Sequence, residues 1–201
     1  KPNPRYAFIS PTFKQGKATA WDYIKTFGKN IPFVKFNESE LRCDFPNGAR
    51  ITILGAENDQ ALRGIFLDGC VMDETQSLSP TIFPEIIRPA LADRKGWCVF
   101  IGTPKGRNYF FELYEQAKEN KDWYACVFKA SDTKILDQEE LDAAKSVISM
   151  LENKAYSLSS NDTWRHRKKR WWMQTAFPNS TTTAVTMKAT VCVKSEVDAS
   201  A

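Results

Sequence analysis

The sequence predicts an α/β domain with a mostly parallel sheet for residues 1–149. Two observations support this fold class: short apolar runs have the length of buried strands, and helical patterns alternate with them. The predicted strands are residues 5–10, 65–73, 96–102 and 123–130. The predicted helices are residues 14–27, 80–91, 108–119 and 137–148. In such sheets, ligands bind at the carboxyl ends of the strands.

Local signals justify the individual elements. The helix at 14–27 places its apolar and aromatic residues on one face, and a short helical turn is expected near 57–63. Two alternating segments surround Asn47-Gly48, which predicts a β-hairpin. Asp137 begins the last clear helix, and Glu140 completes a pattern like a capping box.

Composition narrows the class of protein. Of 201 residues, 42% are hydrophobic and 26% are charged, which is typical of a soluble globular domain. No apolar run reaches the roughly 18 residues that a membrane helix needs, so we expect no membrane association. The five cysteines form no CxxC pair, which argues against a zinc site and a disulfide framework. The net charge of +4 permits a nucleic-acid partner without requiring one.

Residues 150–201 differ in character from the preceding domain. They show no clear period and end in a segment rich in serine and threonine. We therefore predict an irregular tail, either out of frame or disordered. A basic run at 165–170, flanked by tryptophans, could contact phosphates while its rings stack on bases. The alternative is an ordinary solvated charge run.

An acidic pair follows the predicted strand 65–73. Asp73 and Glu74 at this strand end have the arrangement of a Walker B motif. In P-loop ATPases the first acid holds Mg²⁺ and the second orients the water that attacks the γ-phosphate. The alternative is a turn or a helix cap.

A glycine-rich loop follows the predicted strand 96–102. Its sequence, Gly102 to Asn108, is GTPKGRN. Backbone N–H groups and a hydroxyl in such a loop can approach phosphate, and Lys105 and Arg107 add positive charge. The alternative is an ordinary strand-to-helix turn with a basic surface.

Taken together, these segments resemble the large terminase subunit of tailed bacteriophages, the ATPase that drives DNA packaging. The resemblance rests on ALRGIFLDGCVMDE followed by IIRPALADRKGWCVFIGTPKGRNYFFELY, and on the earlier YAFISPTFKQGKATAWDYIK and LRCDFPNGARITILGAEN. It covers about residues 5–148. The implied fold is a P-loop NTPase core of the RecA-like type.

The resemblance also implies roles for single residues and a pair of ligands, ATP and Mg²⁺. Asp73 would ligate Mg²⁺, and Glu74 would act as the base. Thr103, after Gly102, would sense the γ-phosphate and couple hydrolysis to movement. Arg63 matches the position of an arginine that reaches a neighbouring subunit's ATP in some members of the family; the alternative is a surface arginine at a helix end.

The family pattern fails at both ends. Its G-x-x-x-x-G-K-[ST] loop stands upstream of YAFIS, and we expect this chain to begin after it. The nearest similar segment, Pro11 to Ala18, has Gly16-Lys17 but lacks the first glycine and the hydroxyl. The family's RNase H-like nuclease domain is not evident after Ser149, so we predict no nuclease activity.

The function implied is Mg²⁺-dependent ATP hydrolysis coupled to translocation of double-stranded DNA, impaired in this chain because it lacks the loop. The implied partners are double-stranded DNA, a small terminase subunit, a portal protein and further copies in a ring. The implied location is the cytoplasm of the bacterial host, with transient docking on the procapsid. The alternatives are an inactive prophage remnant, a non-catalytic nucleic-acid-binding module and a helicase-like ATPase, which the GTPKGRN loop disfavours.

Overall fold

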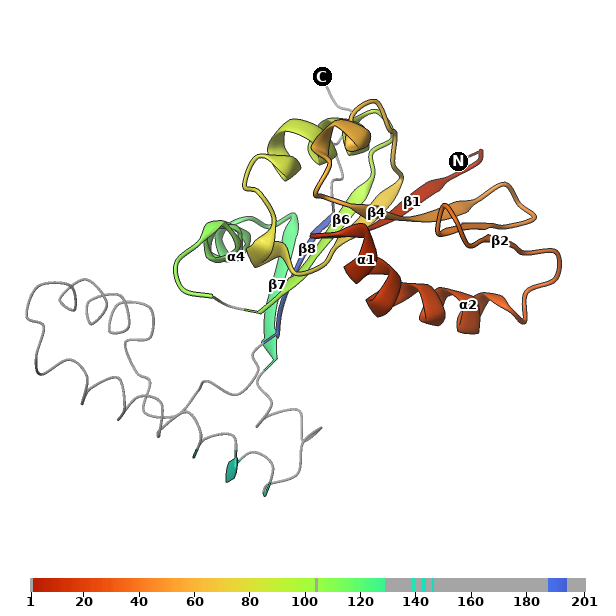
Figure 1. Ribbon diagram of the computed structural model, residues 1–201. Helices are drawn as coiled ribbons and strands as arrows, with labels where there is room; N and C mark the ends of the chain where they lie inside the picture. The colour runs from red at the N-terminus through yellow and green to blue at the C-terminus, as the bar shows by residue number, and fades with distance from the viewer. Residues whose placement is uncertain are drawn as a thin grey trace, which may run out of the picture.

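The computed structural model describes residues 2–103 and 105–128, positions 139, 142, 143 and 146, and the backbone of residues 188–194. Among these residues an eight-stranded sheet forms the central layer, in the order β2-β3-β4-β1-β5-β6-β8-β7 (Figure 1). The strands are β1 (Arg5–Ser10), β2 (Lys35–Asn37), β3 (Arg42–Asp44), β4 (Arg50–Gly55), β5 (Gly69–Met72), β6 (Trp97–Gly102), β7 (Trp123–Phe128) and β8 (Lys188–Lys194).

The strand directions confirm the predicted fold class. β1 pairs in parallel with both β4 and β5, and β5 pairs in parallel with β6. β3 runs antiparallel to β2 and β4, and β8 runs antiparallel to β6 and β7. Every strand except β3 and β8 therefore points the same way, so the sheet is mixed but mostly parallel.

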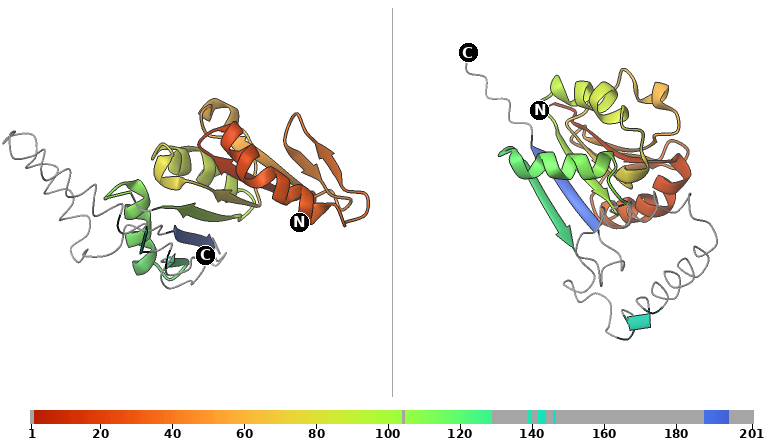
Figure 2. Two further views of the ribbon diagram at one scale, coloured as in Figure 1. Left: turned by 60° about the horizontal axis from the view of Figure 1, so that its bottom comes forward. Right: turned by 90° about the vertical axis from the view of Figure 1, so that its left-hand side faces the viewer.

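Helical segments cover the two faces of this sheet unequally (Figures 1 and 2). One face carries a continuous helical stretch, made of α1 (Phe13–Gly16), the π-helical turn η1 (Lys17–Trp21) and α2 (Asp22–Gly28). The other face carries the remaining segments. These are η2 (Asp59–Leu62), η3 (Thr75–Ser77), η4 (Phe83–Ile87), α3 (Arg88–Ala92) and α4 (Tyr109–Glu119).

Two apolar cores hold these layers together. The larger lies between the central strands and η4, α3 and α4, where Phe100 is fully buried and its ring centroid lies 4.7 Å from that of Phe83. The smaller lies between the first helical stretch and the hairpin, around Trp21 and Ile53. The Trp21 indole also donates a hydrogen bond to Glu38 at 2.7 Å, so its polar nitrogen is satisfied despite burial.

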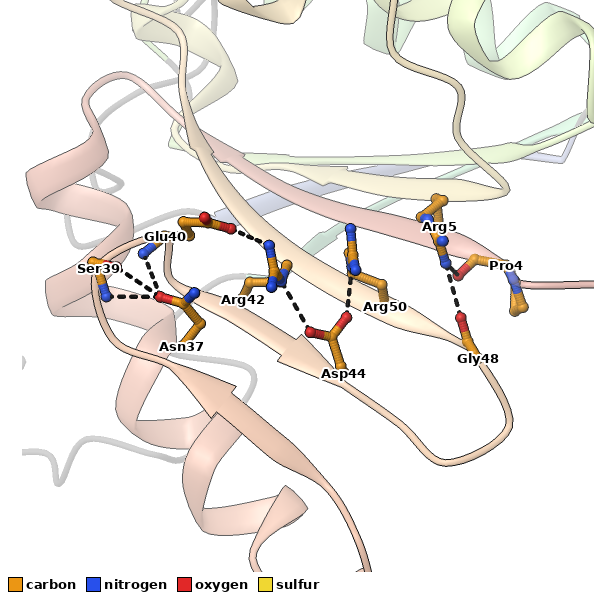
Figure 3. Close-up of polar contacts among 9 residues, drawn as sticks. All are labelled: Pro4, Arg5, Asn37, Ser39, Glu40, Arg42, Asp44, Gly48 and Arg50. Carbon is orange, nitrogen blue, oxygen red and sulfur yellow. Dashed lines mark hydrogen bonds and ion pairs between the residues drawn. The ribbon is translucent and has the colours of Figure 1, made fainter.

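The predicted hairpin is confirmed as β3 and β4. Gly48 has a φ of +82°, which the turn requires and which glycine adopts without strain. The Asp44 carboxylate accepts hydrogen bonds from Arg42 at 2.9 Å and from Arg50 at 2.6 Å (Figure 3). Burial alone would raise the pKa of Asp44, but these hydrogen bonds outweigh it and the pKa lies below its usual range. Arg5 joins β1 to the turn through the Gly48 carbonyl.

The strand predicted at 65–73 is shorter in the structure, where β5 begins at Gly69. Asp68 explains this boundary, because its carboxylate accepts hydrogen bonds from the Arg5 backbone N–H at 2.8 Å and from Arg94 at 3.0 Å. The residues before it leave the sheet to reach α3, and the Leu67 N–H donates to the Ala90 carbonyl. Hydrogen bonds from other parts of the chain thus override a locally strand-like run.

Two strands were not predicted. β2 is only three residues long, and β8 lies within the stretch 150–201, where we expected no continuation of the domain. That expectation is wrong for residues 188–194, because their backbone pairs with β6 and β7 inside the sheet. The other residues of 150–201, including the basic run, lie outside the described residues, as does most of the predicted helix 137–148.

The sheet face next to α2 is only partly covered by the described residues. An apolar hollow of about 620 Å³ lies there, between α2 and residues such as Tyr6, Val71 and Trp97. Tyr23 and Phe27 of α2 border it and are 67% and 75% exposed. Within the described ranges, none of the helices has the length and apolar character needed to span a membrane.

Candidate active site at the ends of β5 and β6

The two predicted loops begin at the same edge of the sheet. β5 and β6 are parallel neighbours with Met72 opposite Phe100, so the loops that follow them emerge side by side. The Thr75 hydroxyl hydrogen-bonds the Met72 carbonyl at 2.9 Å and the Ile101 carbonyl at 3.1 Å. Because this side chain is 1% exposed, it joins the two strand ends from inside the protein.

Asp73 and Glu74 begin the first loop. The Asp73 N–H donates to the Ile9 carbonyl at 2.7 Å, which anchors the loop to β1 as well. Glu74 has a φ of +50°, in the left-handed region that costs a non-glycine residue about 1–2 kcal/mol. Its carbonyl accepts from the Ser77 N–H at 2.8 Å, which closes the turn η3. Both acidic side chains are half-buried.

Gly102 and Thr103 begin the second loop. The Thr103 N–H donates to the side-chain oxygen of Gln76 at 3.1 Å, so the loops are in direct contact. A methyl group at Gly102 would collide with the Gln76 side-chain oxygen, so any larger residue here would displace the Gln76 side chain. The loop ends at Asn108, whose side chain caps α4 by accepting from the Phe111 N–H at 3.1 Å. Lys105 and Arg107 are exposed, as expected of groups available to an anion.

The predicted residues are thus brought together in one place, except for Arg63. The contacts described above tie the pair Asp73 and Glu74 to Gly102 and Thr103. Arg63 follows η2 and forms an ion pair with Glu85 of η4 at 3.9 Å, with 48% of its side chain exposed. An exposed pair of this kind contributes little to stability, so the guanidinium is held only weakly within this chain.

Residues 11–18, the segment most similar to a phosphate-binding loop, already bind a carboxylate of this chain where a phosphate would lie. The Phe13 N–H, at the start of α1, donates to both carboxylate oxygens of Glu57 at 2.9 and 3.0 Å. Thr12 caps the same helix end by accepting from the Gln15 N–H. Lys17 is exposed one turn further on. A carboxylate at this helix end repels phosphate, so the geometry argues against an anion site at Lys17.

The acids of the first loop suit a hard divalent cation. Among the described residues, no group of three or more histidine, cysteine, aspartate or glutamate side chains could hold a metal. Mg²⁺ does not require one, because it binds through one or two carboxylates together with waters and substrate phosphates. Asp73 and Glu74 therefore fit Mg²⁺ delivered with a nucleotide better than a permanent all-protein metal site.

Sequence reasoning missed three residues that organise the site. Thr75 and Gln76 join the two loops. Glu57 occupies residues 11–18, the segment that resembles a phosphate-binding loop. Their partners lie 26, 27 and 44 positions away in the chain. No local pattern in the sequence identifies such pairs, although the position of Gln76 two residues after Glu74 is a weak signal.

A mostly parallel sheet flanked by helices, with polar loops at the carboxyl ends of neighbouring strands, is an open α/β fold. Two crystal forms of the large terminase from one thermophilic bacteriophage share it, with TM-scores of 0.58 and 0.57 at 14% and 15% identity. The second is a complex with ADP. Each similarity covers 72% of this chain and 37% of the other.

The sequence comparison points to the same family, although no family model matches the chain. The large terminase subunits of Thermus phage G20c and Thermus virus P23-45 are each 39% identical to it over 59 residues. Those residues make up 29% of this chain but only 12% of each relative. Sequence and fold together confirm the resemblance to the phage large terminase subunit.

Proposed function

We propose that this chain is part of the ATPase of a phage DNA-packaging motor, and that Asp73, Glu74 and Thr103 face one bound ATP. The observation that carries the proposal is the direct contact between the two loops at the ends of β5 and β6, through Thr75 and Gln76. An acidic turn and a glycine-containing loop held at one edge of a parallel sheet suit a nucleotide and its metal.

Each residue has a proposed role. Asp73 would hold Mg²⁺, which supplies charge neutralisation at the phosphates when bound. Glu74 would accept the proton of the attacking water, and its half-buried position gives it rigid support on one side. Thr103 would contact the γ-phosphate and report its loss to α4 through the loop. Arg63 would leave Glu85 to reach the ATP of a neighbouring subunit.

The proposed partners and location rest on the resemblance to the large terminase subunit and not on this chain's geometry. Both curated relatives are named as large subunits of terminase. We therefore propose double-stranded DNA as the substrate that is moved, with a small terminase subunit, a portal protein and further copies in a ring as partners. The proposed location is the bacterial cytoplasm, with transient docking on the procapsid.

A second candidate is a non-catalytic nucleic-acid-binding module or prophage remnant. It is favoured by Glu57, whose carboxylate occupies the segment most similar to a phosphate-binding loop. With the Glu57 carboxylate in this place, residues 11–18 cannot cradle phosphate, so ATP turnover that relies on them should be slow. Slow turnover agrees with both candidates, so a binding experiment must separate them.

Coupling between nucleotide and DNA distinguishes the two candidates. We expect Mg²⁺ with a slowly hydrolysed ATP analogue to raise the affinity of the chain for duplex DNA by about 5–150-fold, because a motor links the two sites. Fluorescence anisotropy of labelled duplex at constant salt measures this, with Asp73→Asn abolishing the effect and the exposed Asp93→Asn preserving it. DNA affinity that is indifferent to nucleotide would favour the binding module.

A further inference from the structure

Gln76 lies between the two loops and contacts both with one side chain. Its amide nitrogen donates to the Glu74 carboxylate, and its amide oxygen accepts from the Thr103 N–H at 3.1 Å. A backbone N–H can only donate, so the contact with Thr103 fixes the amide orientation. The nitrogen must then face Glu74, which as a carboxylate can only accept. Both ends of the amide are thus used, each by a different loop.

A third contact extends this connection to a helix. The Asn108 side chain donates to the Gln76 backbone carbonyl at 3.4 Å and also caps the first turn of α4. α4 packs in the larger core through Phe110 and Leu113. Gln76 therefore joins the acidic turn, the Thr103 loop and the beginning of a core helix.

We propose that Gln76 is a positioning residue that couples the Glu74 carboxylate to the Thr103 loop and, through Asn108, to α4. A displacement of Glu74 would release the Gln76 amide, and the Thr103 N–H would lose its partner. Gly102 makes the arrangement possible, because any larger residue would push Gln76 away. The consequence for motor chemistry rests on the proposed function; the coupling itself requires no nucleotide and is testable without one.

The test follows the hydrogen exchange of the Thr103 amide by NMR in the whole chain. We expect Gln76→Ala to speed this exchange about tenfold, because the amide loses its acceptor. Glu74→Ala should speed it about threefold in the native background, since Gln76 loses its anchor. In the Gln76→Ala background, Glu74→Ala should cause no further increase in the exchange rate of the Thr103 amide. Gln60→Ala, which removes an exposed glutamine on η2, is the matched control and should leave Thr103 unchanged.

Gln76→Glu separates the contact with Thr103 from the contact with Glu74. It also replaces Gln76→Ala in the experiment if that variant does not fold. It keeps an oxygen acceptor for Thr103 but replaces the donor to Glu74 by a like charge. Thr103 should stay protected in this near-isosteric variant, and Glu74→Ala, which now removes a repelling charge instead of an anchor, should no longer speed its exchange. Native exchange at Thr103 in Gln76→Ala, or an equal response to Glu74→Ala in every background, would overturn the coupling.

The outcome for Gln76 is independent of the outcome for ATP hydrolysis. If Thr103 responds as expected but Glu74→Gln leaves ATP turnover unchanged, Gln76 retains its role and the proposed function fails. If Thr103 does not respond but turnover depends on Glu74, the function stands and the role of Gln76 is refuted.

Discussion

Replacing Glu74 by glutamine should lower ATP turnover by about 10²–10⁴-fold, because the amide cannot accept the proton of the attacking water. The substitution keeps the size of the side chain and its ability to accept a hydrogen bond from Gln76. Binding of nucleotide should therefore change much less than turnover. Phosphate release by the chain measures the effect.

Glu115→Gln is the control for this experiment, since Glu115 lies on α4 with its side chain 45% exposed and pairs only with Lys118 of the same helix in the contacts described. We expect it to leave turnover unchanged. Equal turnover by the Glu74→Gln variant and the native protein would show that Glu74 is not the base.

Truncating Phe100 should lower the stability of the fold strongly. Phe100→Ala is expected to lower the free energy of unfolding by about 3–5 kcal/mol, because it leaves a cavity in the larger core. The side chain is fully buried, and its ring meets Phe83 edge-on at 4.7 Å and Trp123 in a stacked arrangement at 6.3 Å. Since Phe100 stands two positions before Gly102, the loss should also loosen the Thr103 loop.

Chemical denaturation followed by circular dichroism measures this change. Phe111→Ala is the matched truncation, because Phe111 is 37% exposed on α4 and its loss should cost less than that of the fully buried Phe100. Similar losses for the two variants would contradict the assignment of Phe100 to the core that supports the site.

The sequence analysis predicted what local patterns can encode. The apolar runs of β1 and β6, the hairpin turn at Gly48 and the helix capped by Asn108 all carry short-range signals, and all are present. The acidic pair and the Gly102-Thr103 loop were located because each directly follows a strand. Parallel pairing of β5 and β6 then brings them together without further information from the sequence.

Contacts between distant parts of the chain explain what was missed. The Asp68 carboxylate delays the start of β5 through its contacts with Arg5 and Arg94, which lie 63 and 26 positions away. β8 enters the sheet between β6 and β7 although residues 129–187 separate it from β7. A seven-residue run at that distance gives no sign of its partners, and β-pairing depends strongly on such context.

Locating a bound nucleotide tests the central claim most directly. We would titrate the isotopically labelled chain with Mn²⁺ and ATP and follow the broadening of amide resonances by the paramagnetic ion, which reveals even weak binding. The account predicts that residues 73–76 and Thr103 broaden first and that Asp73→Asn removes the effect. Broadening centred elsewhere, for example near Lys17, or broadening that persists in Asp73→Asn, would contradict a nucleotide site at the ends of β5 and β6.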